Sequence, residues 1–294
     1  MGLTVAVSLL AAVCFGVASV LQHRGALRAR PRTPLHPGLL VELAGKPGWL
    51  AGAAAQAAGV SLHLLAVNLG PLSVVQPILT VGLVVALLLQ RLSGRRISRS
   101  SLLAAGLVMV GLAAFLVVTP SFAAAGPVTL AGWAPGLLLA GAVLAAVALA
   151  GLLGSGTVRC VCFGASAGVL MATSAALGKA WGAVLHSGGL VALAGSWQLW
   201  AAVACGALGT LLSQAAFQAG PLGGSLATMM AIDPVIGVGL GVVVFGEPFA
   251  TSSTAAPRAL GLAVTLVGVI LLATAQRAAQ GPAARSGERP LSQV

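Results

Sequence analysis

The stretch at 221–245 reads PLGGSLATMMAIDPVIGVGLGVVVF, and its only ionisable residue, Asp233, stands near the middle. A helix needs about 20 consecutive apolar residues to cross the hydrocarbon core of a bilayer. This stretch is long enough to do so, and it has too few polar side chains to form a water-exposed helix face. It therefore predicts a transmembrane helix that carries one carboxylate near the middle of the bilayer.

Stretches of the same kind recur along the whole chain. Of its 294 residues, 59% are hydrophobic and 6% are charged, whereas roughly a quarter of the residues of a soluble globular protein are charged. We therefore predict an all-α polytopic membrane protein with about nine transmembrane helices. The apolar runs place these spans at 3–22, 47–67, 71–90, 101–119, 131–153, 159–182, 199–217, 221–245 and 257–276.

The basic residues predict the orientation. The formal net charge is +11, and 13 of the 15 Lys and Arg residues fall on one side of the nine spans. Because Lys and Arg are enriched in cytoplasmic loops, the N-terminus is expected outside and the C-terminus in the cytoplasm. The basic, Pro-rich loop 23–46 is expected to be extended and cytoplasmic, with a short amphipathic piece at 38–44 as an alternative. The tail 277–294 is expected to be disordered.

Two parts of the chain resemble each other. Gly-Pro-Leu occurs at 70–72 and at 220–222, and a proline follows each, Pro77 and Pro234. Aligning the two prolines places identical residues at Val81 and Val238, Gly82 and Gly239, Leu83 and Leu240, and Val85 and Val242. In the predicted topology the two copies cross the membrane in opposite directions, as the inverted repeats of secondary transporters do. The first repeat is placed at 1–120, with four helices, and the second at 121–276, with five.

Four features of the sequence resemble the EamA-type repeat of the drug/metabolite transporter superfamily. They are two helices joined by Gly-Pro-Leu, a proline in the middle of a helix, an acid at a helix end in Gly246-Glu247, and a final Gly-rich helix. The four-helix first half, with its long loop, is similar to the NIPA-type magnesium transporter branch. Gln90 stands where the first copy would usually have an acid. The resemblance implies a secondary transporter that works by alternating access.

The candidate substrate or coupling group is Asp233, because a carboxylate at mid-bilayer costs about 2.5–3.5 kcal/mol and usually has a function. The alternatives are that Asp233 caps a helix restarted at Pro234 or forms a salt bridge for packing. Pairing with Lys179 is disfavoured, because Lys179 lies nearer the end of its span and can snorkel. The full set of candidate substrate or coupling residues is Asp233, Gln76, Gln56, Thr228 and Ser225, with helix breaks at Pro77 and Pro234.

The predicted function is transport of a small metabolite or drug-like solute across the cell membrane, coupled to protons or cations. The alternatives are a magnesium or divalent cation transporter of the NIPA type and a non-transporting membrane scaffold or assembly protein. An enzyme is not expected, because catalysis usually needs clustered acids, histidines or a metal set. No cofactor, metal site or nucleic-acid partner is expected. The predicted partners are the lipid bilayer, the small-molecule or cation substrate and, in a homodimer, a second copy of the chain.

Overall fold

The computed structural model describes residues 2–30, 36–69, 75, 78–94, 97–117, 128–246 and 252–279, and for a few residues within the helices it describes only the backbone. Helices joined by turns make up this part of the chain, and it contains no strand. Six of these helices are long and apolar enough to cross a membrane, as expected for a polytopic membrane protein. They are α1 (Gly2–Leu27), α7 (Leu130–Leu153), α8 (Gly156–Ala194), α9 (Trp197–Ala219), α10 (Leu222–Phe245) and α11 (Ser252–Ala279).

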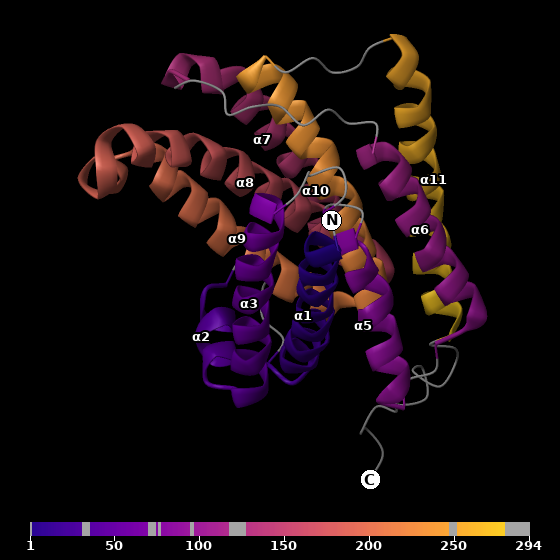
Figure 1. Cartoon of the computed structure of the whole chain (residues 1–294). Coiled ribbons are helices and arrows are strands. Elements are labelled where there is room, and N and C mark those ends of the chain that lie inside the picture. Colours follow the sequence, from indigo (N-terminus) through magenta and orange to yellow (C-terminus); the bar gives the residue numbers. More distant parts are fainter. Residues whose placement is uncertain are drawn as a thin grey trace.

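Four further helices have described bounds (Figure 1). They are α2 (Gly38–Ala44), α3 (Pro47–Leu69), α5 (Val81–Leu92) and α6 (Arg99–Val117). Each of the nine predicted spans overlaps a described helix, but those at 47–67, 71–90 and 101–119 overlap α3, α5 and α6, which are not among the six. The first part of the span predicted at 71–90 lies largely outside the described residues. The predicted tail begins inside α11, which continues to Ala279, and residues 280–294 lie outside the described part as well.

Helix α8 differs most from the prediction, because it continues to Ala194 rather than ending at 182. Its last part follows a change of direction at Gly189, whose φ of 70° and ψ of −168° are not helical. Only glycine adopts this conformation readily. The helices α8 and α9 therefore form a long hairpin, which extends to the left in Figure 1.

The loop 23–46 also differs from the extended segment expected. Helix α1 continues to Leu27, and α2 occupies 38–44, where the alternative placed a short amphipathic piece. The side chains of Leu39 and Leu43 are fully buried, in a cluster that includes Leu211 of α9. Two apolar residues four positions apart give this short helix one apolar side, and this side fixes it to the bundle.

Contacts between helix pairs show the directions in which the helices run. Helices α1 and α3 are antiparallel: Thr4 Oγ1 near the start of α1 donates a hydrogen bond to the carbonyl oxygen of Leu69 at the end of α3, at 3.0 Å. Helices α8 and α10 are parallel, because Gly164 packs against Ser225 and Gly168 against Met229.

The same two kinds of pairing occur elsewhere in the bundle. Helices α1 and α5 are parallel, with Ala12 and Gly16 against Gly82 and Val85. Helices α6 and α11 are antiparallel, with Gly111 near Gly261 and Val108 near Gly268. Small residues at these crossings let the helix backbones approach closely, as is usual within membranes.

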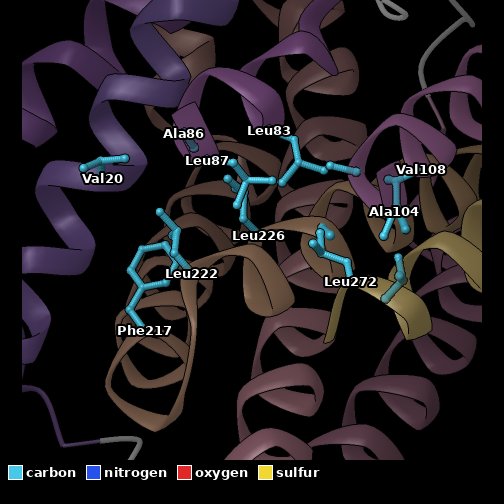
Figure 2. Packing of buried hydrophobic residues seen from close by; sticks show 14 of the residues in the cluster. Val20, Leu83, Ala86, Leu87, Ala104, Val108, Phe217, Leu222, Leu226 and Leu272 are labelled. Atoms are coloured by element: carbon cyan, nitrogen blue, oxygen red, sulfur yellow. The ribbon is translucent and has the colours of Figure 1, made fainter. Parts of the chain in front are cut away.

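The largest cluster of buried apolar side chains joins the two ends of the sequence. Figure 2 shows Val20 of α1, Leu83 and Leu87 of α5, Leu226 of α10 and Leu272 of α11 within one packed group. Phe217 of α9 and Ala104 of α6 belong to the same cluster. Helices from the first and the second half of the chain therefore share one core.

A second cluster, of aromatic side chains, lies at the N-terminal end of α9, whereas Phe217 lies near the C-terminal end. The ring of Trp133 at the start of α7 is fully buried and makes edge-to-face contacts with two other rings. These are Trp197 at the start of α9, at 5.8 Å between ring centroids, and Phe245 at the end of α10, at 5.5 Å.

Candidate functional site

Asp233 lies near the middle of α10, on the part of the helix that packs against α8. A Cβ atom added to Gly168 of α8 would lie 3.3 Å from the backbone nitrogen of Asp233, so the two backbones are in close contact there. The residue as a whole is neither fully buried nor fully exposed. No hydrogen bond or ion pair joins it to another side chain in the part of the structure that is described.

The backbone of α10 is helical throughout Leu222–Phe245. The helix break expected at Pro234 is therefore not observed, and Asp233 does not begin a helix, so the capping interpretation is wrong for this arrangement. Proline removes one backbone donor, but helices within a membrane tolerate it where neighbouring groups compensate. Only the backbone of Lys179 is described, so its expected snorkelling lies outside the described side chains.

Ser225 and Thr228 lie on α10, before Asp233. Both are buried, and each uses its hydroxyl within its own helix. Ser225 donates to the carbonyl oxygen of Leu222 at 3.1 Å, and Thr228 donates to that of Gly224 at 2.7 Å. No described hydrogen bond joins either of them to Asp233. Their donors are already satisfied, so what they could offer a ligand is a hydroxyl lone pair.

The other predicted site residues lie apart from Asp233. Gln56 is exposed on α3, so it faces out of the packed bundle rather than into a site between helices. Its position halfway along a predicted span indicates its depth in the membrane but not the side of the helix on which it lies. Gln76, Pro77 and Glu247 are outside the described residues.

A network of polar side chains joins α1, α3 and α9, and it centres on Gln214, which is fully buried. Trp49 Nε1 donates to Gln214 Oε1 at 3.1 Å, and Gln214 Nε2 donates to Gln22 Oε1 at 3.0 Å. One turn further along α9, Gln218 Nε2 donates to the carbonyl oxygen of Ala26 at 3.0 Å. These bonds hold the first half of the chain to the second, so both glutamines have the packing role that is usual for intramembrane amides.

A polar cavity of about 600 Å³ lies beside this network, between the C-terminal ends of α1 and α5. Arg24 Nη2 donates a hydrogen bond to Ser93 Oγ across it. His23, only 2% exposed, lies in its wall with Nε2 at 3.3 Å from the carbonyl oxygen of Gly220. The residues that line the cavity are Val20, His23, Arg24, Leu27, Arg28, Gln90 and Ser93.

Sequence reasoning assigned the arginines of this cavity to topology and noted Gln90 only as the counterpart of Glu247. One signal could have drawn attention to the region: Gln22, His23 and Arg24 are three consecutive polar residues at the end of an apolar run. What they face could not be known, because Gln90 and Ser93 stand more than 60 residues away in the sequence.

The comparisons with known proteins give one relative. The chain is 29% identical over 248 residues to an uncharacterized protein of Corynebacterium glutamicum, and the match covers 84% of this chain and 86% of that protein. No family model matches the chain, and no solved structure matches it. Because that relative is itself uncharacterized, the functional conclusion depends on the residues of this chain.

Proposed function

We propose that the protein is a secondary transporter of the drug/metabolite type, which moves a small metabolite or drug-like solute across the cell membrane by alternating access. Coupling to protons or to another cation would depend on Asp233. The chain would cross the membrane nine times with its N-terminus outside, in two inverted repeats.

The observation that carries the proposal is the reciprocal crossing of α6 and α11. A Cβ atom on Gly111 would lie 2.8 Å from the carbonyl oxygen of Gly261, and one on Gly261 would lie 2.8 Å from that of Gly111. The sequences at 111–117 and 261–267 read GLAAFLV and GLAVTLV, with five of seven residues identical. When two inverted halves are related by a two-fold axis, equivalent residues of the two halves can meet across an antiparallel pair of helices, as Gly111 and Gly261 do.

Other segments repeat at nearly the same spacing. The two Gly-Pro-Leu triplets are 150 residues apart, as are Gly111 and Gly261. The sequence Val-Cys-Phe-Gly occurs at 13–16 in α1 and again at 161–164 in α8. In each copy its glycine contacts a parallel neighbour, Val85 and Gly82 of α5 for Gly16 and Ser225 of α10 for Gly164.

This constant spacing supports an alignment without insertions over α3, α6, α9 and α11. It does not favour the alignment on Pro77 and Pro234. That alignment inserts seven residues into the second copy after Gly-Pro-Leu, and the alignment would need a deletion of the same length before Gly261. The repeat itself is supported more strongly, because three separate segments now carry it.

The link from an inverted repeat to transport is mechanical. In inverted-repeat transporters the site lies near the midplane between the repeats, and the halves rock to open it to either side. Asp233 suits a coupling role because it lies near the middle of α10, is partly exposed and has no described partner. The directions of the four helix pairs described above agree with those expected for nine successive crossings.

The two alternatives receive less support. Magnesium is usually held through carboxylates and keeps several of its waters, and the described residues contain no group of three His, Cys, Asp or Glu side chains that could hold a metal ion. A non-transporting scaffold would account for the buried amide network, but it would give no reason for a carboxylate in the middle of a helix that has no partner among the described residues.

Transport is tested by reconstituting the protein into vesicles that enclose a pH-sensitive dye. Candidate solutes are added to the wild type, to Asp233→Asn and to the control Glu42→Gln, whose carboxylate lies on α2. We expect at least one solute to drive proton movement in the wild type and the control, and none to do so in Asp233→Asn. Solute uptake without proton movement in the wild type would remove proton coupling, and equal activity in Asp233→Asn would remove Asp233 from the mechanism. The absence of both solute uptake and proton movement would favour the scaffold.

A further inference from the structure

The cavity between α1 and α5 carries positive charge that no described carboxylate neutralises. Arg24 and Arg28 both line it, and neither forms an ion pair with another described residue. The described salt bridge nearby joins Lys46 to Glu42, whose carboxylate also accepts from the backbone nitrogen of Arg30 at 2.9 Å, and neither residue of the pair lines the cavity.

Helix dipoles reduce this positive charge but do not cancel it. The parallel helices α1 and α5 both end at the cavity, and the C-terminus of a helix is equivalent to roughly half a negative charge. Two helix ends therefore oppose about one of the two arginine charges. The remaining charge is positive, which favours an anion in the cavity.

Gln90 supplies a second and independent observation. Its side chain is 95% buried in the wall of the cavity, and its Nε2 has no hydrogen-bond partner. A buried donor that lacks a partner costs about 1–3 kcal/mol. The nitrogen has almost no accessible surface in this conformation, so the side chain must turn toward the cavity before a ligand oxygen can accept from it and remove the cost.

The geometry holds one of the arginines in place. Ser93 Oγ accepts from Arg24 Nη2 and itself donates to the carbonyl oxygen of Leu89 at 2.6 Å. The guanidinium is thereby fixed against the end of α5, while its other N–H groups remain available to a ligand. Such preorganisation lowers the entropy lost on binding.

We propose that this cavity is a binding site for an oxyanion of the phosphate class, contacted by the guanidinium groups of Arg24 and Arg28 and by the amide of Gln90. Phosphate suits this set better than a carboxylate, because it has more acceptor oxygens and up to two negative charges, and arginine binds it through paired hydrogen bonds. A volume of about 600 Å³ leaves room for an attached organic group. The oxyanion would be either a free phosphate compound or the headgroup of an anionic lipid.

The test uses the full-length protein purified in a neutral detergent and a chloride buffer. Binding of inorganic phosphate is measured by calorimetry, and phosphatidylglycerol and phosphatidylcholine are compared in mixed micelles by the melting temperature. Saturable binding of phosphate would identify a site for free phosphate compounds. Stabilisation by phosphatidylglycerol alone, lost in Arg24→Gln, would identify a lipid headgroup site.

Three variants separate a built site from general charge. Arg24→Gln is expected to weaken binding about tenfold, as for the loss of a charge-assisted hydrogen bond. Gln90→Leu is expected to weaken it by a similar factor while raising the melting temperature of the unliganded protein, because it removes a buried donor without a partner. The control Arg99→Gln removes an exposed charge at the start of α6 and should bind within twofold of the wild type.

Two results would overturn the proposal. The first is that neither phosphate nor phosphatidylglycerol binds the wild-type protein. The second is that Arg99→Gln weakens binding as much as Arg24→Gln, which would show general attraction to a basic surface. The binding measurements involve no transport, so a failure here would leave the proposed transport function standing, and a failure of transport would leave this site standing.

Discussion

Gly111 of α6 and Gly261 of α11 lie against each other's backbone, and a Cβ atom added to either would come within 2.8 Å of the other's carbonyl oxygen. Figure 1 shows the two helices side by side, although they stand at the ends of the two halves of the sequence. In a membrane the attraction between helices comes from close packing and hydrogen bonds rather than from the hydrophobic effect. The absence of both side chains is therefore what allows this contact.

Replacing Gly111 with alanine should destabilise the protein. The added methyl group would force the backbones of α6 and α11 apart, and overpacking of this kind typically costs about 1–3 kcal/mol. The control is Gly106→Ala on the same helix, where an added Cβ meets nothing within 4 Å. There alanine should be neutral or stabilise the helix by about 0.5–1 kcal/mol. Thermal unfolding in detergent measures both, and equal melting temperatures would contradict the close crossing.

The replacement Gln214→Leu should weaken the attachment of α9 to α1 and α3. It removes the acceptor of Trp49 Nε1 and the donor to Gln22, and leaves both half-buried partners without these hydrogen bonds. We expect a loss of about 1–2 kcal/mol, near the upper end for hydrogen bonds between membrane helices. Gln56→Leu, on the exposed side of α3, is the matched control and should not lower the melting temperature. A larger effect at Gln56 would show that the outward placement of this residue is wrong.

The change of direction at Gly189 should depend on glycine. Its φ of 70° and ψ of −168° lie in a region that other residues enter at a cost of about 1–3 kcal/mol. Gly189→Ala should therefore lower the melting temperature, or straighten the end of α8 and alter the hairpin with α9. Gly141→Ala, on the exposed side of α7, serves as the control because an added Cβ meets nothing there. Unchanged stability and unchanged protease sensitivity of the hairpin in Gly189→Ala would exclude the strained backbone.

The helices could be predicted from the sequence because their length and hydropathy are set by the bilayer. The sides on which they pack could not be predicted, because most of these helices are apolar around their whole circumference and lack a distinct polar side. Gln56 illustrates this limit: its depth was inferred from its position in the span, but it faces outward. In α2 the difficulty was different, since nothing in the long basic loop reveals that Leu39 and Leu43 will be buried in a cluster with Leu211 of α9.

The candidate site could be predicted in part. Asp233 was recognisable because a carboxylate in an apolar run is costly and therefore rare. The cavity that contains Arg24 and Gln90 could not be recognised, because its residues come from two distant helix ends. Their arginines also have a sufficient explanation in the positive-inside rule, so the sequence alone offered no reason to assign them a second role.

The orientation can be tested with single cysteines, introduced after the four native cysteines have been replaced. Val41→Cys in α2 and Leu190→Cys near the end of α8 are both placed at well-exposed positions. If the basic loops are cytoplasmic, a membrane-impermeant maleimide should label position 190 in intact cells and position 41 only after the cells are opened. The physical reason is that 13 of the 15 basic side chains would otherwise have to face outward. Labelling of both positions in intact cells would place positions 41 and 190 on the same side of the membrane. This result would contradict the odd number of crossings predicted between them. It would also contradict the inverted relation between the two halves, which depends on that number.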